Sequence, residues 1–228
     1  KYRLINFETT KKIAIQCAMV GVKRLIFLSS VGVLGNNTNN RKPFLYSDEP
    51  NPMEDYAISK LEAERSLLEI SNNTGLEIVV IRSPIVYGPS APGNLNRLIK
   101  LIKTRLPLPF SLINNQRSLI GVENLIDIII RCINHPDAKG KSFLVSDGED
   151  LSTPELIKLI ASSMGIKAHL FPVPLYLLKF IGSLFGKRKE INRFVGSLRV
   201  DDSYTKEILN WTPPISVEEG IRRMVKDK

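Results

Sequence analysis

Residues 23–30 have the sequence KRLIFLSS, and residues 76–82 have the sequence LEIVVIR. Each is a short, almost entirely apolar run, which is typical of a parallel strand whose two faces are both covered by helices. Between them, apolar residues at helical spacing predict a helix over 55–71, and Gly75 follows it. Strand, helix and strand in this order indicate a βαβ unit, so we expect an α/β fold with a parallel sheet.

Hydrophobic periodicity predicts further elements on both sides of this unit. Ser152-Thr153-Pro154-Glu155 marks a helix start, because Ser caps the helix, Pro suits its first turn and Glu follows three residues after the cap. The other expected elements are a helix over 5–20, a polar loop over 36–52, a helix over 95–102, an extended connection over 106–110, a strand over 117–122, a helix over 124–134 and a strand over 142–146.

The composition is that of an ordinary globular protein. The chain has 228 residues, of which 43% are hydrophobic and 24% charged, and this excludes a disordered chain, a collagen-like repeat and a coiled coil. Two cysteines, Cys17 and Cys132, cannot build a disulfide framework or a four-ligand zinc site. With only His135 and His169 besides them, we predict no metal site.

A formal net charge of +9 admits three kinds of partner: nucleic acid, an anionic membrane, or a phosphate-bearing small molecule. The sequence has no zinc-finger spacing, no basic helix and no repeat of aromatic and basic residues, so no nucleic-acid partner is predicted. The phosphate-bearing small molecule is the partner that we expect.

The segment Tyr56-Ala-Ile-Ser-Lys60 carries the most informative chemistry. Residues four apart on a helix project from the same face, and a neighbouring ammonium lowers the pKa of a tyrosine from its usual value of about 10. Such a pair can transfer protons at neutral pH. The pair alone is weak evidence, because a surface Tyr and a solvated Lys often have this spacing.

The pair stands between two strand ends that carry polar groups. Ser29 and Ser30 end the first strand, where a hydroxyl can bond a substrate oxygen, although ordinary capping of the strand end is the simpler explanation. The second strand continues into Arg82-Ser-Pro-Ile-Val-Tyr-Gly-Pro89. Ligands bind at the carboxyl ends of parallel strands, so these groups are expected at one edge of the sheet.

In this order, the motifs resemble those of extended short-chain dehydrogenases/reductases, and specifically the NAD-dependent epimerase/dehydratase family that acts on nucleotide sugars. The resemblance covers essentially the whole chain. Thr9 replaces the usual Gly of the first family motif, and Leu34 replaces the usual Tyr of the second. The matching segments are Asn6 with Thr10, Leu28 to Gly35, Asp48-Glu49-Pro50, Arg117 to Val122, Phe143 to Gly148, and Asp201 to Pro213.

The resemblance implies a role for each matching residue. Tyr56 is the implied acid/base, Lys60 tunes it and binds the nicotinamide ribose, and Ser30 holds the reacting substrate oxygen. Ser29 is the neighbouring candidate and is assigned with the cofactor. The implied cofactor residues are Asn6, Ser29, Tyr56, Lys60, Pro84, Ile85 and Val86, and the implied substrate residues are Ser30, Asn94 and Arg117. A surface salt bridge is the alternative role for Arg117.

The implied fold is the C-terminal part of a Rossmann-like parallel sheet with a smaller α/β substrate-binding lobe. Residues 1–90 and 112–147 are expected to form a partial NAD-binding Rossmann domain, and residues 91–111 and 148–228 the substrate-binding lobe. The family's glycine-rich turn, which holds the cofactor pyrophosphate at a helix N-terminus, has no counterpart in this sequence. We therefore expect the chain to be the C-terminal part of a longer protein.

The implied function is an NAD-dependent 4-epimerase of UDP-sugars that works through a 4-keto intermediate, in a cytoplasmic homodimer; NADP is the alternative cofactor. Ile85 stands where many members have a substrate-contacting Asn, and Ser118 and Gly121 replace an Asp and a His. These departures keep two alternatives open. One is a reductase of UDP-4-keto-6-deoxy-N-acetylglucosamine, and the other is a nonenzymatic dinucleotide- or sugar-binding protein on the same fold.

Residues 175–189, LYLLKFIGSLFGKRK, form an apolar segment followed by a basic one. Such a segment can touch an anionic membrane. An apolar stripe at helical spacing is more often packed on the protein core. We therefore expect a helix of the substrate-binding lobe that packs on the core, with no membrane contact.

Overall fold

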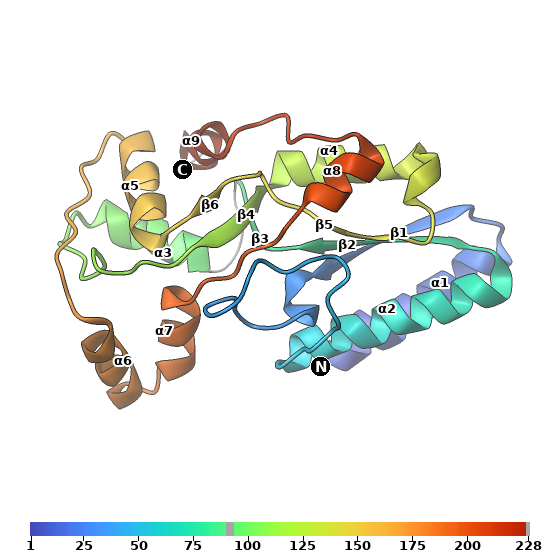
Figure 1. The fold of residues 1–228 in the computed structure, drawn as a ribbon, viewed down its shortest axis with the longest axis horizontal. Helices are drawn as coiled ribbons and strands as arrows, with labels where there is room; N and C mark the ends of the chain where they lie inside the picture. Colours follow the sequence, from blue (N-terminus) through green and yellow to red (C-terminus); the bar gives the residue numbers. More distant parts are fainter. Residues whose placement is uncertain (90–93, 227–228) are drawn as a thin grey trace.

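The computed structural model describes residues 1–89 and 94–226, and it contains two small sheets that lie end to end (Figure 1). The first sheet has the strand order β1-β2-β5 and is parallel throughout. Its strands are β1 (Arg24–Ser30), β2 (Glu77–Ser83) and β5 (Ser142–Leu144). Within this chain the parallel sheet lies in the N-terminal part, not the C-terminal part, because nearly all of the chain after residue 151 that the structure describes is helix or loop. The predicted α/β fold with a parallel sheet is confirmed.

Helices cover both faces of the first sheet (Figure 1). The π-helix η1 (Arg3–Glu8), α1 (Thr9–Met19) and α2 (Asp55–Thr74) lie on one side. On the other side lie α4 (Val122–Asn134) and α8 (Ser203–Leu209). The α2 helix ends at Gly75, whose φ of 76° is a left-handed conformation that glycine adopts without strain.

Strand β2 explains why the sequence has apolar runs rather than an alternating pattern. Ile78 and Val80 point into the core formed with α1 and α2, whereas Val79 and Ile81 point into the core formed with α4 and Trp211. Successive side chains of a strand point to opposite faces. A strand buried on both faces therefore needs an apolar residue at almost every position.

The second sheet has the order β3-β4-β6 and is mixed. Strand β3 (Ile85–Tyr87) pairs parallel with β4 (Arg117–Gly121), which pairs antiparallel with β6 (Asp150–Leu151). The sequence analysis did not predict β3 or β6, since segments of three and two residues carry too little periodicity. The division of the chain into two domains stays a prediction.

Three amphipathic helices share a core with the second sheet. They are α3 (Asn94–Lys103), α5 (Thr153–Ser163) and α9 (Val217–Lys226). The predicted capping box of α5 is present, because Ser152 Oγ accepts from the Glu155 N–H and the Glu155 carboxylate accepts from the Ser152 N–H. Short 3-10 helices, η2 (Val31–Val33) and η3 (Pro136–Ala138), follow β1 and α4.

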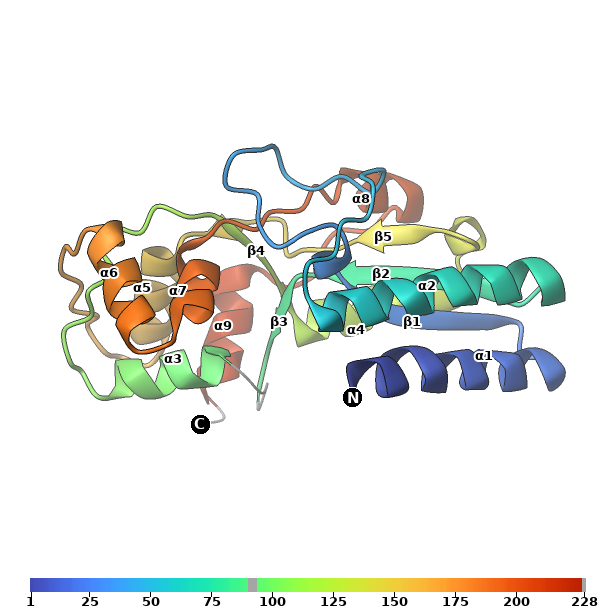
Figure 2. The same cartoon turned by 90° about the horizontal axis from the view of Figure 1, so that it is seen from below.

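The helices α6 (Leu175–Leu184) and α7 (Arg188–Val195) form a hairpin at the end of the molecule away from α1 and β1 (Figure 2). Gly182 of α6 lies close to α7, where a Cβ would stand 2.5 Å from Ile191 Cγ1. Of the α6 residues, only Leu178 and Gly182 are buried. The prediction that this segment packs on the core is therefore wrong. Among the helices that the structure describes, none is long and apolar enough to span a membrane.

Candidate active site

The first turn of α2 holds Tyr56 and Lys60 against the carboxyl end of β1. The Lys60 Nζ atom donates to the Leu28 carbonyl at 2.8 Å and lies 4.6 Å from the centre of the Phe27 ring. It lies 5.9 Å from the centre of the Tyr56 ring. The predicted helix therefore brings both side chains to the strand end that carries Ser29 and Ser30.

Ser30 is the last residue of β1 and caps the short helix η2. Its Oγ accepts from the Gly32 N–H at 3.1 Å, so Ser30 has the capping role expected of a serine at a strand end. A hydroxyl that accepts one hydrogen bond still has its own proton to donate. Gly32 lies between Ser30 and the start of α2. A Cβ on Gly32 would stand 3.3 Å from Ser30 Oγ and 3.4 Å from the Cβ of Ala57, the residue after Tyr56. Ser30 therefore lies near the start of α2, and its hydroxyl proton remains available for a hydrogen bond.

The electrostatics of the pair differ from the expectation. Burial raises the pKa of Tyr56, and the nearby Tyr2 raises it further. Burial also lowers the pKa of Lys60, and Glu64 partly opposes this. The pKa of Tyr56 is therefore raised overall and not lowered as predicted, because the Lys60 ammonium is directed to the Leu28 carbonyl and the Phe27 ring and desolvation dominates.

Asn6 supports the same turn of α2 from the π-helix η1. Its Nδ2 donates to Ser59 Oγ at 3.1 Å, and Ser59 Oγ donates to the Tyr56 carbonyl at 2.7 Å. Ser59 is 1% exposed. Ser59 was not predicted as a site residue, although it lies inside the Tyr-Ala-Ile-Ser-Lys segment. This chain of two hydrogen bonds fixes the backbone that carries Tyr56.

The three residues predicted to line the nicotinamide follow directly on β2. The ends of β1 and β2 are in register, with Ser30 opposite Ser83. Pro84 is buried, Ile85 is 38% exposed and Val86 is half-buried. They therefore begin at the same edge of the sheet as Ser30. Ser29 Oγ, also at this edge, is buried and has no hydrogen-bond partner among the described residues.

Arg117 opens β4 and lies beside the end of α7. One of its Nη atoms donates to the carbonyls of Arg193 and Gly196, and its buried Nε has no partner in the described part of the chain. Burial, and then the charge of Arg193, lower the pKa of Arg117 to about 10. The alternative of a surface salt bridge for Arg117 is wrong, since its partners are carbonyl oxygens. The unpartnered donor beside a second guanidinium suits an anionic ligand.

Arg193 connects this cation pair to the helix of Tyr56. Its guanidinium forms an ion pair with Glu54, the residue that precedes α2. Arg193 was not predicted from the sequence, because no local pattern distinguishes it from the other basic residues near it. Asn94 is the first residue of α3, and its side chain lies outside the described part of the chain.

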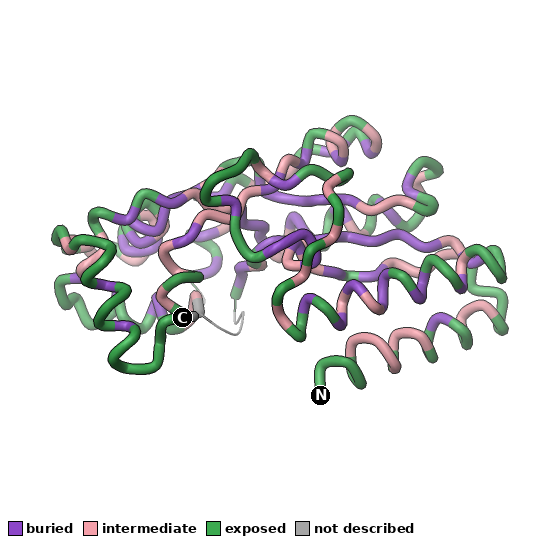
Figure 3. Tube along the Cα trace, turned by 60° about the horizontal axis from the view of Figure 1, so that its bottom comes forward, coloured by how far each residue is buried: buried purple, intermediate pink, exposed green. Residues whose placement is uncertain are grey.

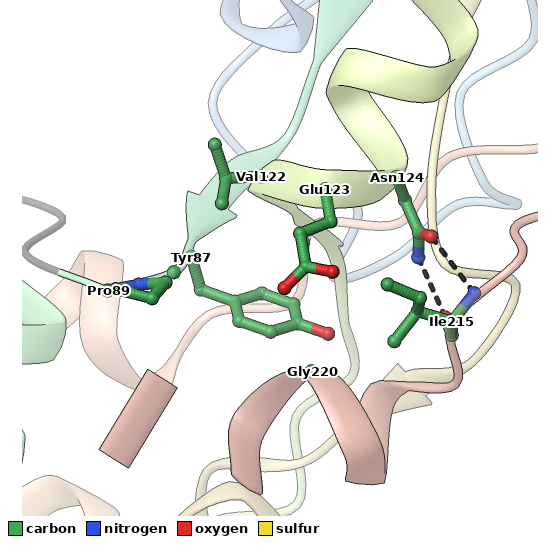
Figure 4. Close-up of a pocket in the computed structure, with 9 residues that line it drawn as sticks. Tyr87, Pro89, Val122, Glu123, Asn124, Ile215 and Gly220 are labelled. Carbon is green, nitrogen blue, oxygen red and sulfur yellow. Dashed lines mark hydrogen bonds between the residues drawn. The ribbon is translucent and has the colours of Figure 1, made fainter. Parts of the chain in front are cut away.

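Tyr87 lines a pocket together with Val122, Glu123 and Gly220 (Figure 4), and its hydroxyl belongs to a second polar cluster. The Tyr87 hydroxyl donates to the Asp147 carboxylate at 2.6 Å, and the same carboxylate accepts from the Gly121 N–H and from Asn124 Nδ2. The Asn124 side chain also exchanges two hydrogen bonds with the backbone of Ile215. Burial raises the pKa of Tyr87 and of Asp147. These buried groups satisfy one another, so we assign them to structure rather than to chemistry.

Comparison with known proteins gives the family. Residues 1–146 match the model of the NAD dependent epimerase/dehydratase family. The chain belongs to this family. The resemblance that the motifs predicted is thereby confirmed, and NAD is the cofactor that the family description names.

Relatives and solved structures of this family cover nearly all of the chain. It is 42% identical over 223 residues to a UDP-glucose 4-epimerase of Vibrio cholerae, covering 97% of this chain and 68% of the relative. It is 24% identical to an N-acetyl-α-D-glucosaminyl-diphospho-ditrans,octacis-undecaprenol 4-epimerase of Escherichia coli, covering 99% and 71%. The crystal structure of a UDP-glucose 4-epimerase from Thermotoga maritima with UDP-glucose superposes with a TM-score of 0.78, at 20% identity, covering 99% and 69%. The chain thus spans about two thirds of their lengths.

The residues of this epimerase/dehydratase chain fit part of an NAD site. An ammonium has three donors, and the contacts of Lys60 in the described structure use one of them, on the Leu28 carbonyl. Donors therefore remain for the hydroxyls of a ribose at the carboxyl end of β1. The individual roles of Asn6, Ser29, Pro84 and their neighbours stay predictions.

Proposed function

We propose that this chain carries the catalytic and substrate-binding parts of an NAD-dependent UDP-sugar 4-epimerase. The observation that carries the proposal is the arrangement of Tyr56, Lys60 and Ser30 at the carboxyl end of β1. The 42% identity to the epimerase of Vibrio cholerae supports the same reaction and the same class of substrate.

In this mechanism the proton steps belong to Tyr56. In its phenolate form, Tyr56 takes the proton of the sugar C4 hydroxyl and becomes a phenol, which later returns this proton to the C4 oxygen. Bound NAD supplies the acceptor, and afterwards the donor, of the hydride at C4. Lys60 stabilises the phenolate through its positive charge, and Ser30 donates a hydrogen bond to the C4 oxygen. Lys60 would hold the nicotinamide ribose of NAD, and the bound cofactor would return the hydride to the opposite face of the 4-keto sugar, which would invert C4.

Arg117 and Arg193 are the proposed partners of the UDP diphosphate. Two neighbouring guanidinium groups repel each other, which is why Arg193 lowers the pKa of Arg117, and an anion between them relieves this repulsion. The buried Nε of Arg117 has no partner among the described residues and gives such an anion a donor. The ion pair between Glu54 and Arg193 holds the two guanidinium groups of Arg117 and Arg193 near the start of α2.

Two of the departures from the family pattern have structural explanations. Ser118 Oγ donates to Asp150 at 2.5 Å and accepts from the Val200 N–H at 2.9 Å. Gly121 lies against the Tyr87 ring, which a Cβ would meet at 3.4 Å, and its N–H donates to the Asp147 carboxylate. Neither residue contacts the predicted catalytic groups through these bonds, so neither departure argues against an epimerase.

The test is product analysis with the full-length protein and a panel of UDP-sugars and UDP-4-keto sugars. An epimerase brings a UDP-sugar and its C4 epimer to equilibrium without net consumption of reduced cofactor. A 4-keto reductase consumes one reduced cofactor for each product formed and would replace our proposal. Binding of a UDP-sugar with no turnover in the presence of NAD would favour the nonenzymatic alternative.

Tyr56→Phe removes the proposed acid/base but keeps the ring. We expect turnover to fall by about 100- to 10,000-fold, since proton transfer by a positioned side chain contributes about that much. UDP-sugar binding, measured by calorimetry, should change little. Tyr176→Phe is the matched control, because Tyr176 is an exposed tyrosine of α6. Full activity of Tyr56→Phe would contradict the assignment.

A further inference from the structure

Helix α6 exposes a large apolar face that nothing in the described structure covers. Tyr176, Phe180 and Leu184 stand one turn apart on it and are 60–75% exposed: 75%, 60% and 68% respectively. Phe185, which follows the helix, is 76% exposed. Figure 3 shows exposed backbone along most of this hairpin. Contiguous exposed apolar side chains of this kind mark a docking surface.

The charge next to this face is mainly positive, and Glu190 of α7 pairs with one of the cations, Lys187, at 3.7 Å. From residue 156 to residue 189 the sequence contains six Lys and Arg residues and no Asp or Glu. Lys179 of α6 and Lys187 and Arg188 after it are exposed and flank the apolar residues. Residues 94–116, which include α3 at the same end of the molecule (Figure 2), carry four more basic residues and no acidic one.

We propose that α6 and the basic turn after it dock on the surface of an anionic phospholipid membrane. An apolar, aromatic-rich helix face flanked by Lys and Arg lies in the headgroup region of such a membrane, with its apolar side chains buried and its cations against the phosphates. For this purpose we define the docking surface as Tyr176, Phe180, Leu184, Phe185, Lys179, Lys187 and Arg188.

The same features disfavour a protein as the occupant. Lysine is depleted from the centres of protein interfaces. A symmetric contact with a second copy would bring identical patches together, so Lys179, Lys187 and Arg188 of both copies would repel one another. Phosphate headgroups, in contrast, neutralise all of them.

Docking by this surface would bring the substrate-binding end of the molecule to the membrane. Helix α7 follows the docking surface directly and carries Arg193, which contacts both Glu54 and the surroundings of Arg117. The proposed diphosphate site therefore lies one short helix away from the lipid. The membrane proposal does not depend on which sugar the enzyme converts.

The experiment is co-sedimentation of the full-length protein with vesicles of phosphatidylcholine alone and of phosphatidylcholine mixed with phosphatidylglycerol. We expect binding to the mixed vesicles that weakens with added salt. Phe180→Ser with Phe185→Ser, and separately Lys187→Gln with Arg188→Gln, should each weaken binding by about tenfold or more. UDP-sugar turnover in solution should stay unchanged in both variants.

Matched controls separate a specific surface from general hydrophobicity or charge. Met19→Ser with Val20→Ser removes apolar residues that are equally exposed, at 75% and 74%, on the end of α1. Lys12→Gln with Lys23→Gln removes two exposed charges, one on α1 and one in the segment that follows it. The proposal requires both controls to bind like the wild type.

Three results would overturn the proposal. The first is no binding to mixed vesicles, and the second is equal loss of binding in patch and control variants. The third is a change in native mass of the Phe180→Ser, Phe185→Ser variant without vesicle binding, which would make α6 a subunit interface or a cover for another part of the chain. In each case UDP-sugar turnover still tests the proposed epimerase separately.

Discussion

At the scale of single residues, the site depends on how far each charge is removed from water. Tyr56 and Lys60 have the spacing that chemistry requires, yet burial moves their pKa values in directions that favour the neutral forms of both. The positive charge of Lys60 then matters most where Tyr56 must ionise, because a phenolate beside an ammonium is more stable than one beside a neutral side chain.

A prediction about pH follows from this pair. Tyr56 must lose its proton to act as a base, and its pKa is raised by burial, so turnover should rise with pH from neutral into the alkaline range. Lys60→Gln removes the charge that favours the phenolate, so the rise should move to higher pH. Lys60→Arg keeps the charge and should leave the rise near its original pH. Profiles of kcat against pH measure this, and identical profiles for Lys60→Gln and the wild type would refute the electrostatic role.

Arg117 gives a second prediction at this scale. Its planar guanidinium can hold two oxygens of a diphosphate, which a lysine ammonium cannot do in the same geometry. Arg117→Lys should raise the KM for a UDP-sugar by about 10- to 100-fold, the loss expected for one or two hydrogen bonds to a charged group. Turnover at saturation should change much less. Arg222→Lys, at a half-exposed position on α9, is the control, and an unchanged KM in Arg117→Lys would remove Arg117 from the site.

At the scale of elements, close contacts between helices decide where side chains stand. The two helices of the α6–α7 hairpin approach each other at Gly182, where there is no room for a Cβ beside Ile191. Hydrophobic periodicity in the sequence does not predict this contact, because a glycine contributes nothing to that periodicity. The contact turns the apolar face of α6 away from the core, which is why the expectation of a buried helix failed.

Gly182→Ala tests this contact. The added methyl group meets Ile191 Cγ1, so we expect the free energy of unfolding to fall by about 1–3 kcal/mol, the usual cost of overpacking. Ile191→Ala in the same chain creates space, and the double variant should be more stable than the sum of the two single changes predicts. Urea denaturation of the wild type, the two single variants and the double variant gives the four free energies of this double-mutant cycle. Strict additivity would mean that the two residues do not touch.

At the scale of the whole molecule, hydrogen bonds join segments that are far apart in the sequence. The Asp147 carboxylate receives donors from β3, from the end of β4 and from α4, and Asn124 extends this network to the segment before α9. The polar loop over 36–52 is likewise held by backbone bonds from Thr38 and Phe44 to the chain between α7 and α8. These hydrogen bonds fix the position of the two sheets relative to each other.

Tyr87→Phe measures the importance of this network. It removes one of the two donors to a buried oxygen of Asp147, which then keeps only the Gly121 N–H among the described residues, so the free energy of unfolding should fall by about 1–3 kcal/mol. The raised pKa of Tyr87 also has a consequence for pH. Because the folded state holds this proton more tightly than the unfolded state does, its stabilisation is complete below pH about 10 and decreases as pH rises above that value. The difference in the free energy of unfolding between neutral and strongly alkaline pH should therefore be smaller for Tyr87→Phe than for the wild type.

The control for Tyr87→Phe is Tyr176→Phe, which changes an exposed hydroxyl and should leave the denaturation curve unchanged. Equal stability of Tyr87→Phe and the wild type would show that water replaces the lost donor.

The sequence by itself determined the α/β fold, the parallel strands, the helix of Tyr56 and Lys60, and the family. These follow from local patterns: strand β2 alternates between two cores, and the order of the motifs is a property of the chain alone. Only the tertiary structure decided the pKa directions of the pair, the meeting of Arg117 with Arg193, the ion pair of Arg193 with Glu54, the support from Ser59 and the exposure of α6. The physical reason is that desolvation and charge–charge contact depend on which distant segments come together, and periodicity along the chain contains no information about those distances.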